Sequence, residues 1–295
     1  MALNQLGMSA KQNTLLEVAR LAMKLSGRYM QPYSHAKSPH KFTQSQLMTC
    51  LILRAYLKTT YRGIIEFLET SEALKKCLGL KRLPHYSTLK YFADRADTLA
   101  IVDAILADVV RQVVAQSGEA KEEVAIDSTG VESTSASAYF NTRRGGKRKR
   151  YVKLSLCVTC STLLPASVVL SWGPCNDKAV ARPLLDKTRA IIQPKKLFAD
   201  AGYDAEWVHQ YCRDDWQVTS WIPPAVHRKD GTVNGKYRSK MTKRRLKIHG
   251  YGRRWMVESF ISGLKRTTGS MLAARHHASL FVEASLRVLA YALRR

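Results

Sequence analysis

Three acidic residues, far apart in the sequence, stand where a carboxylate could do chemistry. Asp127 closes the alternating segment V-A-I-D, and Asp200 closes a second segment, L-F-A-D, just before Ala-Gly-Tyr. Each segment predicts a short strand, and catalytic groups gather where the strands of such sheets end. Glu258 is the only acid in an expected amphipathic helix over residues 251–265. Three carboxylates that meet would need a cation between them, because like charges raise each other's pKa.

Carboxylate oxygens are hard ligands that suit Mg²⁺ or Mn²⁺, held together with water and a substrate phosphate. Two such ions can activate an attacking oxygen and stabilise the leaving oxygen of a phosphodiester. Each residue also has a structural alternative: an aspartate can cap a turn, and Glu258 can form an i, i+4 surface ion pair with Arg254. The combination of all three in a strongly basic chain favours a site that holds two metal ions.

The expected helix over residues 251–265 places its polar residues in one stripe. At about 100° per residue, four of them fall within an arc of roughly 60°: Tyr251, Arg254, Glu258 and Lys265. Apolar residues fill the arc beside this stripe, so Glu258 rides at the edge of a buried face. Trp255 points elsewhere, and we expect it to pack in the core.

The charge of the chain indicates a polyanionic partner. Its 295 residues hold 48 Lys and Arg against 23 Asp and Glu, a formal net charge of +25. Nucleic acid is the first candidate, and a membrane surface is weaker because no apolar run is long enough to span a bilayer. Residues 143–153 carry seven cations and no acid, and residues 226–254 carry eleven cations against one aspartate. A solvated face is the alternative, but we expect phosphate contacts, above all from Arg148, Arg150, Arg244 and Arg245.

Other chemistries find little support in the sequence. There is no Walker loop and no G-x-G-x-x-G segment, so nucleotide triphosphate fuel is not indicated. Cys157 and Cys160 form a C-x-x-C without a second pair, and residues three apart on a strand face opposite ways, which argues against zinc. The N-terminus lacks the features of a signal peptide, so we expect a cytoplasmic protein.

The periodicity changes near residue 120 and predicts two domains. Residues 1–120 read as helices, with a break at Thr59-Thr60 and a strongly amphipathic segment over residues 98–116. A helix-turn-helix DNA reader and a plain helical bundle both fit this half. Residues 121–295 give three strands, a helix, a strand, a helix, a strand, a basic loop and a helix, which predicts a mixed α/β sheet. We therefore expect a helical domain over 1–120 and an α/β domain over 121–295.

The spacing of the polar stripe is itself a motif. Tyrosine, two residues, arginine, three residues, glutamate, six residues and lysine resembles the Y-R-E-K signature of bacterial insertion-sequence transposases of the DDE class. The segments "AIDSTG" and "FADAGYD" resemble those around the family's first and second catalytic aspartates. The resemblance covers roughly residues 85–295. The 57 residues between Asp200 and Glu258 leave no room for the large β-rich insertion of some relatives.

This resemblance implies that residues 121–295 form a ribonuclease H-like catalytic domain in which Asp127, Asp200 and Glu258 hold the metal ions. It implies that residues 1–120 form a DNA-binding and multimerisation domain, and that the protein is bacterial and nucleoid-associated when bound to DNA. It also implies that Tyr251, Arg254 and Lys265 contact phosphates near the cleaved end. The implied activity is metal-dependent cleavage and strand transfer of an insertion sequence. The implied partners are double-stranded DNA, at the terminal inverted repeats and the target, and a second copy of the chain on DNA. A stand-alone ribonuclease H-like nuclease and an inactive DNA-binding relic remain alternatives, although three intact carboxylates argue against the relic.

Overall fold

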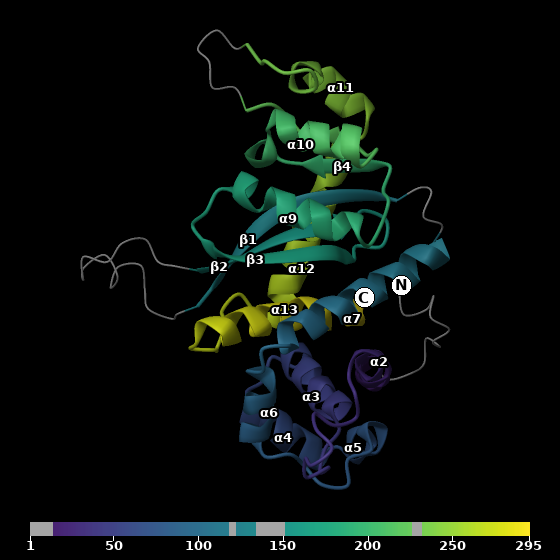
Figure 1. Ribbon diagram of the computed structural model, residues 1–295, viewed down its shortest axis with the longest axis vertical. Coiled ribbons are helices and arrows are strands. Elements are labelled where there is room, and N and C mark those ends of the chain that lie inside the picture. Colours follow the sequence, from purple (N-terminus) through teal and green to yellow (C-terminus); the bar gives the residue numbers. More distant parts are fainter. Residues whose placement is uncertain (1–13, 118–121, 134–150, 226–231) are drawn as a thin grey trace, which may run out of the picture. The chain divides into compact units, whose positions relative to one another are not determined.

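The computed structural model describes residues 14–117, 122–133, 151–225 and 232–295 of the chain. These residues form two compact units, one of residues 1–109 with 264–295 and the other of residues 110–263 (Figure 1). The division differs from the predicted boundary at residue 120, because the C-terminal segment joins the helical unit rather than the unit that contains the sheet.

The helical unit is built from helices of 7 to 20 residues. It contains α2 (Thr14–Tyr29), α3 (Gln44–Tyr56), α4 (Tyr61–Thr70), α5 (Glu72–Leu78), α6 (Tyr86–Ala93), most of α7 (Thr98–Ser117), the end of α12 (Trp255–Thr268) and α13 (His277–Arg294). The predicted break between α3 and α4 is confirmed. Thr60 caps α4 by accepting a hydrogen bond of 2.9 Å from the Gly63 N–H, so the chain restarts a helix rather than continuing α3.

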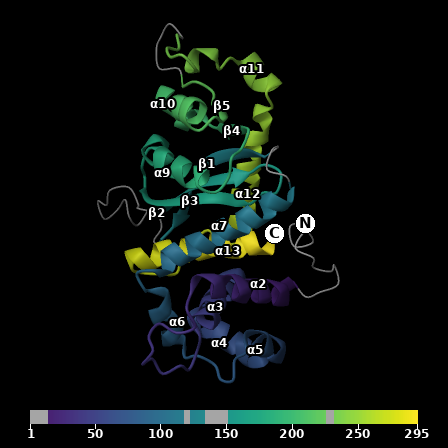
Figure 2. The ribbon, with the colours of Figure 1, turned by 45° about the vertical axis from the view of Figure 1, so that its right-hand side comes forward.

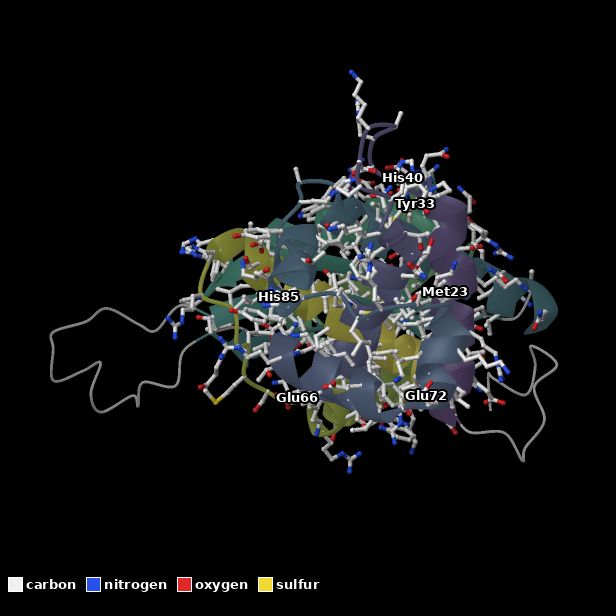
Figure 3. The ribbon with its side chains drawn as sticks, turned by 90° about the horizontal axis from the view of Figure 1, so that it is seen from below. Met23, Tyr33, His40, Glu66, Glu72 and His85 are labelled. Atoms are coloured by element: carbon white, nitrogen blue, oxygen red, sulfur yellow. The ribbon has the colours of Figure 1, made fainter. Side chains whose placement is uncertain are left out.

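The core of the helical unit explains why the C-terminal segment belongs to it. α3 is buried along most of its length, and both α2 and α13 pack against it. α13 is apolar on most of its surface and therefore needs cover on several sides. Figure 2 shows α2 to α6 gathered into one bundle. In the segment between α2 and α3, the Tyr33 and His40 rings stack with centroids 3.9 Å apart (Figure 3).

The second unit contains a mixed five-stranded sheet, as the sequence predicted. Its strands lie in the order β3 (Pro165–Gly173), β2 (Tyr151–Thr159), β1 (Glu123–Glu132), β4 (Lys196–Ala199) and β5 (Thr219–Trp221). β1, β2 and β3 pair antiparallel, whereas β4 pairs parallel with both β1 and β5. β2 is buried from Val152 to Thr159, as expected for a strand covered on both faces.

Helices and short turns complete this unit. α9 (Asp177–Arg189) packs on β2 and β3, and Figure 1 shows it lying across the sheet. The smaller elements are η2 (Ala201–Tyr203), α10 (Glu206–Gln210), η3 (Tyr211–Asp215), η4 (Arg238–Lys240), α11 (Lys243–Ile248) and η5 (Tyr251–Arg254), which leads into α12. Across the described ranges, none of the helices combines the length and apolar character needed to cross a membrane.

Candidate active site

Asp127 and Asp200 occupy equivalent positions beside the parallel strands β1 and β4. The last β1–β4 register pair is Ile126 with Ala199, and the next residue of each segment is one of the two aspartates. Neighbouring strands lie about 4.8 Å apart, and residues in register point to the same face. The sequence expectation that Asp127 ends its strand is wrong, because β1 continues to Glu132 through pairing with β2. The parallel pairing with β4 ends at Ile126, the residue before Asp127.

Asp200 is fixed by the turn that follows β4. Its side chain caps η2, with Oδ1 accepting a hydrogen bond of 2.8 Å from the Gly202 N–H. A Cβ on Gly202 would lie 2.9 Å from Asp200 Oδ1 and 3.1 Å from Asp177 Oδ2. The φ angle of Gly202 is negative, so the backbone conformation does not require a glycine there. The glycine is needed because a larger residue would crowd the Asp200 side chain.

Glu258 reaches the same place from α12. Arg254 hydrogen-bonds to Glu258 one turn along the helix, and its Nη1 lies 3.8 Å from Asp127 Oδ2. The i, i+4 ion pair considered from the sequence is thus present, and it also bridges to the sheet. Glu258 itself is 51% exposed on its side chain, which leaves the carboxylate accessible to a substrate.

Burial sets the charge of Asp127. Burial, aided by the charges of Asp200 and Glu258, raises the pKa of this carboxyl to about 6, although the Ser128 N–H and Arg254 act in the opposite direction. The Ser128 N–H donates to Asp127 Oδ1 at 2.7 Å. One guanidinium therefore does not balance the acids gathered here, and additional positive charge would stabilise all of them.

Tyr251 anchors the start of the same helix to the sheet. Its hydroxyl donates a 3.0 Å hydrogen bond to the carbonyl of Ala199, the residue before Asp200. Burial raises the pKa of this phenol, and the three carboxylates add to that effect while Arg254 opposes it. The phenol is therefore held neutral beside the acids, and its hydrogen bond ties η5 to the end of β4.

The remaining predicted residues lie at different places. Lys265 follows Glu258 by two turns of α12, on the part of the helix that belongs to the helical unit. Arg244 and Arg245 are exposed on α11, and the Arg245 guanidinium lies 5.9 Å from the centroid of the Trp221 ring. Arg148 and Arg150 lie outside the described residues.

Two expectations for individual side chains are wrong. Trp255 is 57% exposed, because it lies roughly opposite Val257 around α12, while Val257, Phe260 and Leu264 form the buried line. Lys153, the last cation of the run over 143–153, is buried rather than available to phosphate. Its Nζ lies 2.8 Å from Asp177 Oδ1 and donates to the Cys175 carbonyl at 2.6 Å.

A chain of hydroxyls behind the aspartates was not predicted. The Ser128 hydroxyl shares hydrogen bonds with the Ser155 hydroxyl at 2.8 Å and the Tyr203 hydroxyl at 2.7 Å. Tyr203 is fully buried, and burial raises the pKa of its phenol. The only sequence signals were the serine after Asp127 and the tyrosine of "FADAGYD". These hydrogen bonds link β1, which contains Asp127, to η2, which Asp200 caps.

The described residues do not form a ready metal cage. Within them, no group of three or more histidine, cysteine or acidic side chains is placed to hold a metal ion. Arg254 instead lies between Asp127 and Glu258, where a cation is expected. The donor set of three carboxylates is nevertheless of the kind that Mg²⁺ and Mn²⁺ prefer.

Comparison with known families gives the chain its class. Residues 118–293 match the family model described as "Transposase DDE domain". The chain belongs to this family. The Transposase DDE domain match includes Asp127, Asp200 and Glu258 together with the whole sheet. A search of curated proteins found no match.

Among solved structures, the chain is similar to a piggyBac transposase, determined as a synaptic complex with hairpin DNA. The two are 8% identical with a TM-score of 0.44, and the match covers 99% of this chain and 73% of the other.

Proposed function

We propose that the chain is a DNA transposase that cleaves and transfers the strands of an insertion sequence through Asp127, Asp200 and Glu258. The observation that carries the proposal is the placement of the three carboxylates. Asp127 and Asp200 each come directly after the last register pair of the parallel strands β1 and β4, and Arg254 links Glu258 to Asp127. The strand order β3-β2-β1-β4-β5 supports a ribonuclease H-like core.

The same three carboxylates would hold two Mg²⁺ or Mn²⁺ ions. Bound ions of this kind activate the attacking oxygen and stabilise the leaving oxygen of a phosphodiester. The raised pKa of Asp127 supports this assignment, because added positive charge would relieve the repulsion that burial makes costly. For metal binding, Arg254 would give up its contact with Asp127 or with Glu258.

The neighbouring side chains then have separate tasks. Tyr251 holds the start of the helix against the end of β4 through the Ala199 carbonyl. Arg254, once released, and Lys265 would contact phosphates of the DNA strand near the cut. Asp200 stays oriented by the Gly202 N–H, so its outer oxygen remains available to a ligand. The protein thus supplies orientation and charge on one side of the scissile phosphate.

The substrate would be double-stranded DNA that carries the element's terminal inverted repeats. Water would first hydrolyse a phosphodiester at the element's end, and the freed 3′-hydroxyl would then attack the target DNA. Because two ends must be brought together, we expect a homodimer on DNA. The helical unit would read the repeats, and the exposed cations of α11 would contact the backbone.

One assay separates this proposal from its rivals. Purified protein with Mg²⁺ is given a labelled duplex that ends in the element's own repeat together with a supercoiled target plasmid. Joined product supports the transposase, cleavage without joining points to a nuclease, and binding without cleavage points to an inactive DNA-binding protein. Asp127→Asn and Asp200→Asn variants serve as controls, since both should bind the duplex but produce neither product.

A further inference from the structure

The helical unit contains a cavity of about 810 Å³ whose lining includes none of the three carboxylates. Its walls come from the junction of α3 and α4, from α6, and from the segment between α12 and α13 with the start of α13. Six cationic side chains contribute to the lining, against the single carboxylate of Glu283: Arg54, Lys58, Arg62, Lys90, Arg275 and Arg287. The lining is therefore strongly positive.

Glu283 forms only a long ion pair with Arg54. Its carboxylate already accepts hydrogen bonds from the Ala273 and Ala274 N–H groups and, at 2.7 Å, from Arg287 Nη2. Arg54 Nη2 lies 4.0 Å from Glu283, beyond hydrogen-bond distance, and Arg54 Nε is buried without a hydrogen-bond partner. Arg54 is only 7% exposed on its side chain, and a buried N–H group that lacks an acceptor is costly. Among the described residues this N–H has no acceptor, so an anionic oxygen of a ligand would satisfy it.

Three tyrosines also line the cavity. The Arg54 guanidinium lies 4.0 Å from the ring centroid of Tyr61, and Arg62 lies 4.6 Å from that of Tyr86. Tyr91 on α6 is 74% exposed, so its ring is open to a partner. Nucleic acid bases stack on such rings regardless of sequence. The cavity is also far larger than a phosphate ion requires and falls within the range of pockets that take organic ligands, about 300–1,000 Å³.

We propose that this cavity binds one phosphorylated nucleotide, with the phosphate at Arg54 and Arg275 and the base against Tyr91. The nucleotide can be free or can be an unpaired nucleotide of a DNA strand, since both present the same phosphate and base. The cavity lining shares no residue with the candidate active site, and only the use of this cavity on DNA rests on the proposed transposase function.

The test is isothermal titration of the full-length protein, without divalent metal, against deoxyadenosine monophosphate and against inorganic phosphate. We expect the nucleotide to bind at least about tenfold more tightly than phosphate, because stacking adds to the charge contact. Tyr91→Ala and Arg275→Ala should each weaken nucleotide binding by about tenfold. Both residues are exposed, so the fold should survive. Lys24→Ala, which removes an exposed cation elsewhere in the same unit, should leave binding unchanged.

Failure of the nucleotide to bind, equal affinity for phosphate, or an equal loss in Lys24→Ala would overturn the proposal. Arg54→Lys adds a further check, because lysine keeps the charge but loses the planar fork. Weaker nucleotide binding in this variant, with an unchanged circular dichroism spectrum, would support the assigned phosphate contact. Nucleotide binding as tight as wild type would remove Arg54 from the site and overturn the assignment.

Competition then identifies the source of the nucleotide. Two duplexes are compared, one blunt and one with a single unpaired terminal nucleotide. Displacement of deoxyadenosine monophosphate by the second duplex alone supports the site and identifies DNA as its source. Displacement by neither supports a site for free nucleotides, and equal displacement by both overturns the single-nucleotide assignment. No cleavage enters these measurements, so their outcome is independent of whether the chain proves to be a transposase.

Discussion

Arg254 joins the helix to the sheet, and its two acidic partners set the charge balance of the candidate active site. The guanidinium contacts both Glu258 and Asp127, yet the pKa of Asp127 still rises to about 6. The single positive charge of Arg254 therefore does not offset the negative charges of three acids, of which Asp127 is mostly buried. This imbalance is the residue-level reason to expect that added divalent cations stabilise the unit.

Glu258→Gln should separate DNA binding from chemistry. Glutamine keeps the length and helix propensity of glutamate but cannot offset metal charge. We expect cleavage of a terminal-repeat duplex in Mg²⁺ to fall by at least about 100-fold, while gel-shift affinity holds or rises slightly. Glu66→Gln, on an exposed position of α4 labelled in Figure 3, is the matched control and should cleave normally. If Glu258→Gln nicks DNA at the wild-type rate, Glu258 is no more than the ion-pair partner of Arg254.

Gly202→Ala should disturb the position of Asp200 without unfolding the unit. The added Cβ would crowd Asp200 Oδ1 at 2.9 Å and Asp177 Oδ2 at 3.1 Å, so the aspartate side chain must shift. We expect cleavage to drop by about tenfold or more, since a small misplacement of a catalytic group is costly. Gly252→Ala is the control, because a Cβ there meets nothing within 4 Å. Equal activity in the two variants would show that Asp200 tolerates displacement and does not act directly.

At the scale of the elements, the sequence predicted which strands form the sheet better than it predicted where each strand ends. Periodicity predicted all five strands and the break between α3 and α4, because those signals are local. The extension of β1 to Glu132 was missed, since it depends on pairing with β2 along its whole length. The packing of α13 in the helical unit was missed for a related reason. The apolar surface of α13 shows that the helix must be buried, but it does not identify the helices that cover it.

The candidate site shows the same division. Helical spacing predicted that Tyr251, Arg254 and Glu258 share one stripe, and the structure places this stripe near Asp127 and Asp200. The catalytic roles of these residues stay predictions. Helical spacing cannot reveal that Tyr251 bonds the Ala199 carbonyl, or that Lys153 turns inward to Asp177. Both contacts depend on segments distant in sequence. The functional role of Lys265, and of the cations on α11, stays a prediction.

A buried histidine should make the sheet-containing unit sensitive to acid. His209 on α10 is fully buried, with Nδ1 2.8 Å from the Ser220 hydroxyl and Nε2 without a hydrogen-bond partner. Burial, aided by the Arg213 charge, lowers the pKa of His209 from 6.5 to about 4. Between pH 6.5 and pH 4, His209 is protonated in the unfolded chain but neutral in the folded chain. The free energy of unfolding should therefore fall as the pH drops from 6.5 to 4, by on the order of 3 kcal/mol.

All five tryptophans lie between residues 172 and 255, so their fluorescence reports this unit in urea unfolding. His209→Gln, which cannot titrate, should lose stability at pH 7 but show a shallower decline between pH 6.5 and 4. His35→Gln, at an exposed position of the helical unit, should behave as wild type. A decline in His209→Gln as steep as that of wild type would assign the acid sensitivity to other groups.

Across the whole molecule, the net charge of +25 is not all available to DNA. Several cations of the run over 226–254 find acidic partners elsewhere in the chain. Arg238 pairs with Asp204 at 2.6 Å, and Arg253 pairs with Glu123 at 2.7 Å. The sequence predicted phosphate contacts along this run, but the fold gives some of its cations acidic partners within the protein. The exposed cations that remain on α11 are the better candidates for phosphate contacts.

Arg244 and Arg245 provide the test of that selection. Each cation that touches a phosphate releases about one counterion, so Arg244→Ala with Arg245→Ala should lower the slope of log K against log salt by about two. The measurement is duplex affinity by fluorescence anisotropy from 50 to 300 mM salt. The matched control removes Arg182 and Arg189, two exposed arginines of α9 in the same unit. Their loss should leave the slope near its wild-type value if the contact surface is local to α11. Equal slopes for the two double variants would mean that α11 faces solvent in the complex, and that the charge of the protein attracts DNA without a defined contact there.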